Sequence, residues 1–269
     1  MLWFGMPALI EMEDLEETAA LCRELGLSFI ELNMNFPQYQ FGAMDPARLR
    51  QIARRYGIFY TLHLDDNMNV ADFNPAVAKA YEDTVLGAVA LAKELDIPVI
   101  NMHLSLGGVV TLPQRKVYLF EQYTEQFLRR MAQFRDRVSQ AVGDANIRIC
   151  VENTNGYPDW QAEALDVLLE SKAFGLTLDT GHDFCTGGGD LEWLRSRGNR
   201  LHHMHLHDAA LPKRDHLALG DGEMDIRDRL ELARRCDCTV VLEIKTAQAL
   251  RRSVSWLDDH WDQTRYSLY

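Results

Sequence analysis

Short apolar runs alternate along the chain with longer segments in which apolar residues recur every three or four positions. Eight of the runs are rich in β-branched and aromatic residues, and they begin near positions 2, 29, 59, 99, 147, 174, 201 and 239. The segments between them, such as 14–26, 74–96 and 124–143, have the helical period, and several open on Asp, Asn or Thr. The pattern predicts eight strands that alternate with helices.

Strict alternation of strand and helix indicates a parallel sheet, because each helix carries the chain back to start the next strand in the same direction. Eight such strands close a barrel, so we expect an α/β fold, a single-domain (β/α)8 TIM barrel over residues 1–269. No Ser-, Gly- or Pro-rich linker divides the chain. An open doubly wound sheet is the alternative, but the first run is followed by PALIEME rather than by a Gly-rich phosphate loop.

Composition narrows the class of partner. The formal net charge of −12 opposes attraction to nucleic acid phosphates and to anionic membranes. The five cysteines are scattered and odd in number, so they do not indicate a disulfide framework and favour a reducing compartment. The N-terminal segment MLWFGMPALIEMEDLEE has no basic region and runs quickly into acids, unlike a signal peptide or a membrane span. We therefore expect a cytoplasmic protein that binds neither nucleic acid nor membrane.

Polar residues stand where most of the predicted strands end. Barrel enzymes carry their chemistry at the C-terminal ends of the strands, on side chains that face the barrel axis. Alternation along each strand then gives one inward acid or imidazole at seven of the eight ends: Glu31, His63, His103, Glu152, Asp179, His205 and Glu243. A lone residue of this kind is usually structural, but seven on one rim would repel and desolvate one another without a cation. Nitrogen and oxygen ligands without an inward Cys suit Zn²⁺, Mn²⁺ or a similar ion.

The stretch RLHHMHLHD, residues 200–208, holds four histidines in nine positions. Successive side chains of a strand face opposite sides, so the four histidines cannot form one site. His203, His205 and His207 share the inward face, while His202 faces the helices. We expect His205 to be a metal ligand, His203 to lie deeper in the barrel, and His207 to lie just past the strand.

An ordered set of strand-end motifs carries a family resemblance. The segments HLDDNMNVADFNP, NMHLSLGG, VENTNG, LDTGHDFCTGGGDL, HMHLHDA, HLALGDGEMD and VLEIK resemble those of the xylose isomerase-like TIM barrel superfamily over roughly residues 59–245. That superfamily includes sugar-phosphate isomerases and epimerases and also endonuclease IV. The resemblance implies a shared metal site with four ligands: Glu152, Asp179, His205 and Glu243.

Further ligands follow from the resemblance to endonuclease IV. His63 and His103, with Glu152 bridging, match the ligands of a second metal. His182 and His216 match two of the three ligands of a third metal, but the position of the third ligand is Arg214 here, and a cation there argues against that site. We therefore expect one or two divalent ions per chain, drawn from Zn²⁺, Mn²⁺, Co²⁺ and Mg²⁺.

The leading hypothesis is a metal-dependent isomerase or epimerase that acts on a small sugar or sugar-phosphate-like substrate. The metal would acidify the proton next to a carbonyl and stabilise the enediolate. Glu152 and Glu243 would exchange protons on opposite faces of the substrate, and His182 would orient an oxygen. The remaining predicted substrate contacts are Glu31, Asn153, His207, Arg214 and Lys245.

Two other reaction classes stay open. One is metal-dependent hydrolysis of a phosphodiester at abasic DNA, which His63 and His103 favour because two close metals can clamp the attacking and leaving oxygens. Arg214, the net acidity and the lack of clustered Lys and Arg in the loops oppose it. The basic cluster between positions 48 and 55 falls on a predicted outer helix. The other class is a lyase or dehydratase that uses the same metal. A homo-oligomer also remains open.

Overall fold

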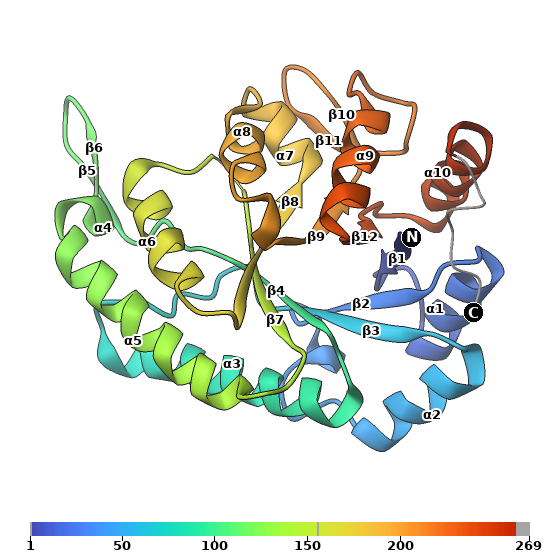
Figure 1. Ribbon diagram of the computed structural model, residues 1–269, viewed down its shortest axis with the longest axis horizontal. Helices are drawn as coiled ribbons and strands as arrows, with labels where there is room; N and C mark the ends of the chain where they lie inside the picture. The colour runs from blue at the N-terminus through green and yellow to red at the C-terminus, as the bar shows by residue number, and fades with distance from the viewer. Residues whose placement is uncertain (1, 155, 262–269) are drawn as a thin grey trace.

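The computed structural model describes residues 2–154 and 156–261. Eight parallel strands form a closed barrel in the order β1, β12, β9, β8, β7, β4, β3, β2 (Figure 1). Each strand pairs in parallel with both neighbours, as in the pairings of β1 with β12 and of β8 with β9. The predicted (β/α)8 barrel is confirmed.

The barrel strands lie where the apolar runs predicted them, within two residues at most ends. They are β1 (Trp3–Pro7), β2 (Phe29–Asn33), β3 (Phe59–His63), β4 (Val99–His103), β7 (Arg148–Glu152), β8 (Phe174–Asp179), β9 (Leu201–Leu206) and β12 (Thr239–Leu242). The predicted alternation also holds, because the outward residues Leu62, Met102 and Met204 are buried against the helices.

Helices follow the barrel strands, and most of them cover the outside of the barrel, whereas α7 (Thr180–Cys185) begins at the C-terminal rim and lines the central pocket. The helices are α1 (Leu15–Glu24), α2 (Pro46–Tyr56), α3 (Pro75–Leu95), α4 (Leu119–Gln122), α5 (Thr124–Val142), α6 (Asp159–Leu169), α7, α8 (Gly189–Arg195), α9 (Ile226–Cys236) and α10 (Ala247–His260), with short 3-10 turns at Pro37–Tyr39 and Gly198–Arg200. The side chains of Asp14, Asp45 and Asn74 cap the first turns of α1, α2 and α3. These acceptors satisfy backbone N–H groups that have no partner within the helix. None of the described helices is long and apolar enough to cross a membrane.

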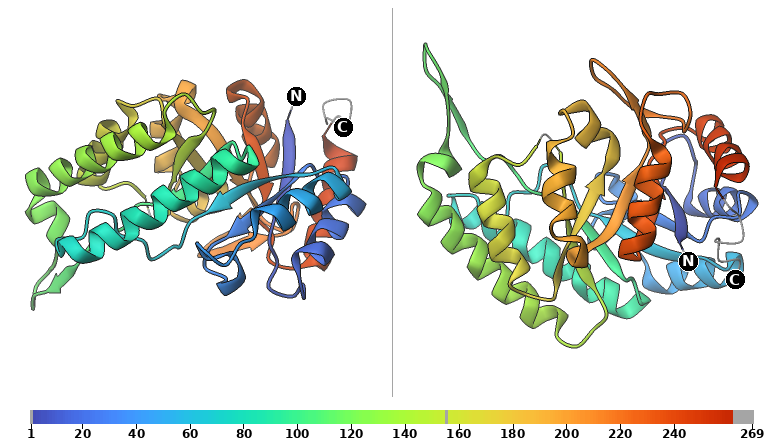
Figure 2. Two further views of the ribbon diagram at one scale, coloured as in Figure 1. Left: turned by 90° about the horizontal axis from the view of Figure 1, so that it is seen from below. Right: turned by 45° about the horizontal axis from the view of Figure 1, so that its top comes forward.

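Two small hairpins were not predicted from the sequence. Strands β5 (Val109–Thr111) and β6 (Lys116–Tyr118) follow β4, and strands β10 (Asp208–Ala210) and β11 (Arg214–Leu217) follow β9. Both hairpins grow from the C-terminal ends of barrel strands, so they stand around the same rim. The β5–β6 hairpin projects away from the body of the molecule in every view (Figures 1 and 2).

Candidate metal centre

Four potential metal ligands converge at the C-terminal rim of the barrel. Glu152, Asp179 and His205 lie at or near the ends of β7, β8 and β9, and Glu243 follows β12 directly. One ligand atom from each lies within 4.8 Å of the others. The Nδ1 atom of His205 is 3.3 Å from an oxygen of Glu152 and 3.4 Å from an oxygen of Glu243. The structure thus brings together the four residues that the motifs singled out.

The buried carboxylates and the buried imidazole of this cluster shift one another's pKa values. Burial raises the pKa values of Glu152 and Glu243, but the charge of the neighbouring His205 outweighs it, and both pKa values lie well below the usual range. Burial lowers the pKa of His205, but the charges of Glu152 and Glu31 outweigh it and hold that pKa well above its usual value. Without a metal, a proton on His205 is therefore the local compensation for the carboxylates.

The donor set fits a divalent cation. Both ring nitrogens of His205 and Oε2 of Glu243 are buried, and none makes a hydrogen bond of good geometry with another described residue. Buried polar atoms are almost always paired, and because Nδ1 and Oε2 lie 3.4 Å apart, a common partner for these two atoms is expected at the centre of the cluster. Three carboxylates and one imidazole would pair with Zn²⁺, Mn²⁺, Co²⁺ or Mg²⁺ there.

Glu31, predicted as a substrate contact, lies against His205 and does not line the central pocket, although it lines a smaller cavity beside it. It is 2% exposed, and its carboxylate contacts Nε2 of His205 and Nε2 of His203, each at 2.9 Å. Thr61 also donates a hydrogen bond to it at 3.0 Å. A carboxylate on Nε2 fixes the ring of His205 and leaves Nδ1 free to face the other ligands.

His207 and Asn153, both predicted as substrate contacts, are completely buried and position Asp179. Nδ1 of His207 accepts a hydrogen bond from the backbone of His216 at 2.7 Å. Its Nε2 therefore carries the proton and donates to Asp179 at 3.0 Å. The amide of Asn153 bonds both backbone groups of Asp179. A Cβ on Gly181 would lie 2.1 Å from the His207 ring, so glycine is required there.

A second cluster adjoins the first. The Nε2 atoms of His63 and His103 lie 3.4 Å and 3.2 Å from Oε2 of Glu152. Nδ1 of His63 is 2.7 Å from the carbonyl oxygen of Leu64, which makes Nδ1 the donor and leaves Nε2 free to face Glu152. Burial lowers the pKa of His63, but the hydrogen bond and charge of Glu152 outweigh it and raise that pKa to about 9.

Asp66 joins this second cluster and was not predicted. Its Oδ1 atom lies 3.7 Å from His63 and 3.8 Å from His103, and the three residues could hold a metal ion. The motif HLDDN places it three residues after His63, on the loop past the strand, where strand alternation no longer gives side-chain direction.

The third metal cluster, which Arg214 argued against, is not among the potential metal groups of the described residues. His182 belongs to none of the potential metal groups among the described residues, and its ring centre lies 5.7 Å from that of His216. Arg214, predicted as a substrate contact, is exposed and does not line the central pocket. Its neighbours Lys213 and Asp215 line the pocket instead, because the β10–β11 hairpin turns them inward.

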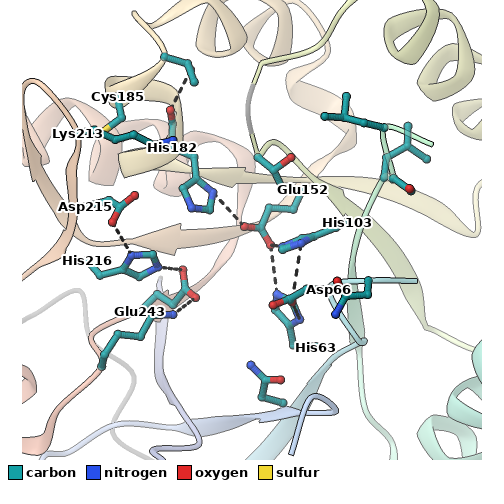
Figure 3. Close-up of a pocket in the computed structure, with 18 residues that line it drawn as sticks. His63, Asp66, His103, Glu152, His182, Cys185, Lys213, Asp215, His216 and Glu243 are labelled. Carbon is teal, nitrogen blue, oxygen red and sulfur yellow. Dashed lines mark hydrogen bonds and ion pairs between the residues drawn. The ribbon is translucent and has the colours of Figure 1, made fainter. Parts of the chain in front are cut away.

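The clusters open into one pocket with a volume of about 580 Å³ (Figure 3). His182, His216 and Lys245 line it, as their predicted roles require. Nδ1 of His182 contacts the carbonyl oxygen of Asn153 at 3.2 Å, so Nε2 is the ring nitrogen left for a ligand. The Nζ atom of Lys245 lies 2.7 Å from Oε1 of Glu243.

Residues 19–260 match the family model described as the xylose isomerase-like TIM barrel, and the chain belongs to that family. A protein of Methanocaldococcus jannaschii, uncharacterized protein MJ1311, is 25% identical over 206 residues, which is 73% of this chain and 67% of that protein. Membership of this family agrees with the closed barrel that the structure shows.

Three solved structures illustrate the range of proteins with this fold. A D-tagatose 3-epimerase-like protein is 22% identical, with a TM-score of 0.78 and 96% of each chain covered. The IolI protein with a bound zinc atom is 14% identical, with a TM-score of 0.73 and 96% of this chain and 97% of that chain covered. An AP endonuclease of family 2 from Brucella melitensis is 15% identical, with a TM-score of 0.69 and 97% and 100% covered.

Proposed function

We propose that this protein is a metal-dependent isomerase or epimerase of a small carbohydrate. The observation that carries the proposal is the convergence of Glu152, Asp179, His205 and Glu243 on one point at the floor of the pocket. Two of these ligands, Glu152 and Glu243, also line the pocket itself. They are therefore within reach of both a bound cation and a substrate.

Neighbouring residues fix the orientation of two of the side chains that would bind the cation. Glu31 sets the ring of His205, and His207 and Asn153 set Asp179. A divalent cation held there would polarise a carbonyl and a neighbouring hydroxyl and so acidify the proton on the adjacent carbon. The protein contributes a preorganised arrangement, which keeps the cost of reorganisation low.

Glu152 and Glu243 would move the proton. Their environments differ, because Glu152 accepts a hydrogen bond from Asn101 and lies within 4 Å of four histidines, whereas Glu243 pairs with Lys245. We assign one carboxylate to proton removal and the other to proton return on the opposite face of the substrate. His182 would orient a substrate oxygen through Nε2.

The pocket favours a polyol. Side chains that form hydrogen bonds with hydroxyl groups surround the metal cluster: Asn33, Asn67, Ser105, Thr154 and Thr186. Lys213 and Lys245 add positive charge to the wall, so a phosphate or carboxylate on the sugar is compatible with the pocket. The epimerase-like neighbour with the same fold supports a carbohydrate substrate.

The proposal is tested with a panel of ketoses and ketose phosphates. Metal-loaded protein should convert at least one member into an isomer or epimer, detected by chromatography. Chelation should abolish conversion, and returning the metal should restore it. If no member is converted by protein shown to contain the metal, the proposed reaction class is wrong.

A second candidate function is phosphodiester hydrolysis, and the His63, His103 and Glu152 cluster favours it. Glu152, His63 and His103 would hold a second cation, and two close cations would supply positive charge for the oxygens of a phosphate. We expect incubation with an abasic DNA duplex to give no more nicking than the chelated control, because the net charge of −12 opposes binding of DNA. Metal-dependent nicking that follows the protein through purification would replace the sugar assignment.

The Glu31→Gln variant should bind the divalent ion about 10- to 100-fold more weakly, because it loses the carboxylate that orients His205. The measurement is metal titration by calorimetry. Glu82→Gln is the matched control, since Glu82 is also a buried carboxylate but lies on α3, outside the barrel, and pairs with Arg137 of α5. Equal metal affinity in Glu31→Gln and the control would show that Glu31 does not position the ligand.

A further inference from the structure

The β5–β6 hairpin has an apolar surface that no other described part of the chain covers. Residues 109–118, called the arm below, extend from the loop after β4 and project away from the barrel (Figure 2). Val109, Val110 and Leu112 are 44%, 45% and 41% exposed. A two-stranded ribbon alone in water is marginally stable, so an exposed apolar arm is typical of an element that binds a partner.

The arm is also a basic element on an acidic protein. Arg115 and Lys116 are both exposed. No described carboxylate forms an ion pair with either of them. The whole chain has a formal net charge of −12, so two copies repel one another unless an interface joins opposite charges.

An acidic hollow lies at the root of the arm. It has a volume of about 710 Å³, and its wall includes the rings of Tyr118 and Trp160 and the carboxylates of Glu121, Asp159 and Glu163. All three carboxylates are on exposed residues, and none forms an ion pair with a described cation. The hollow therefore offers aromatic surface surrounded by uncompensated negative charge, whereas the arm offers aliphatic surface with uncompensated positive charge.

We infer that two copies of this chain form a dimer in which each arm occupies the acidic hollow of the other copy. Because arm and hollow adjoin on one surface, a two-fold axis can satisfy both at once, as an isologous interface requires. Arg115 and Lys116 would pair with the partner's carboxylates, and the aliphatic residues would cover its aromatic rings. Leu106 lines both the hollow and the central pocket, so the interface would adjoin the substrate site.

Charge reversal in two complementary variants tests this interface. Sedimentation of the full chain should show a dimer at micromolar concentration that weakens with added salt. The arm variant R115E/K116E and the hollow variant E121K/E163K should each dissociate roughly 100-fold more readily, because each places like charges opposite one another. When the two variants are mixed, each arm again meets a hollow of opposite charge, and a heterodimer should form.

The control variant R54E/K172E changes the net charge by the same amount as the arm variant R115E/K116E, but at two exposed cations away from the arm. It should remain a dimer. A monomeric wild-type protein, a dimer that both variants retain, or a mixture that stays monomeric would each overturn the inference. These outcomes do not depend on activity, so they are independent of the proposed reaction.

Discussion

Glu152→Gln and Glu243→Gln should each lower the turnover of the carbohydrate substrate by about 10²- to 10⁴-fold. The amide keeps the size of the side chain and one ligand oxygen but cannot accept a proton. A group that transfers a proton in the rate-limiting step is therefore lost, while the pocket keeps its shape. The measurement is kcat for the interconverted sugars, with the metal content of each variant determined in parallel.

Glu192→Gln is the matched control, because Glu192 is an exposed carboxylate on α8 and does not line the pocket. It should retain the activity of the parent protein. If both pocket variants bind metal normally and also retain turnover, the two glutamates do not transfer the proton.

His205→Ala should abolish stabilisation by metal and also destabilise the metal-free protein by about 3–5 kcal/mol. The imidazole lies against carboxylate oxygens of Glu31, Glu152 and Glu243, and its removal leaves buried charges uncompensated. Metal bound only to the folded state raises the free energy of unfolding by mass action, so the variant should lose that increment as well. Urea unfolding with and without added metal measures both effects.

His202→Ala provides the comparison within the same strand. His202 is partly exposed and lies on the opposite face of β9, near Gly175. This variant should keep the full increment in stability from metal. An increment of the same size in His205→Ala would exclude His205 as a ligand.

Strand alternation predicted side-chain direction at the rim, and order along one strand placed His203 deeper than His205, but neither could compare depth between different strands. His203 and His205 do face inward, and Glu31 does too, yet Glu31 does not line the central pocket and pairs with both histidines. Alternation along a strand distinguishes two faces only, whereas the height of a residue in the barrel depends on the register with neighbouring strands. That register is a tertiary property.

Residues beyond the strand ends were predicted less well, for the same reason. The sequence predicts Arg214 as a substrate contact, whereas the β10–β11 hairpin, which strand and helix alternation does not predict, places Lys213 and Asp215 in the pocket wall. The β5–β6 hairpin had a local signal, since the runs VVT and KVY flank the turn sequence LPQR. No feature of the local sequence predicts that this hairpin points away from the barrel. Loop geometry depends on contacts that distant segments supply.

The most direct test of the proposed proton transfer is hydrogen exchange in deuterated water. Metal-loaded protein is incubated with the ketose panel, and NMR follows the proton on the carbon next to the carbonyl. The account predicts that deuterium enters that position in at least one sugar, together with its isomer or epimer, and that chelation stops both. Absence of exchange in every sugar, with the metal site fully loaded, would contradict it.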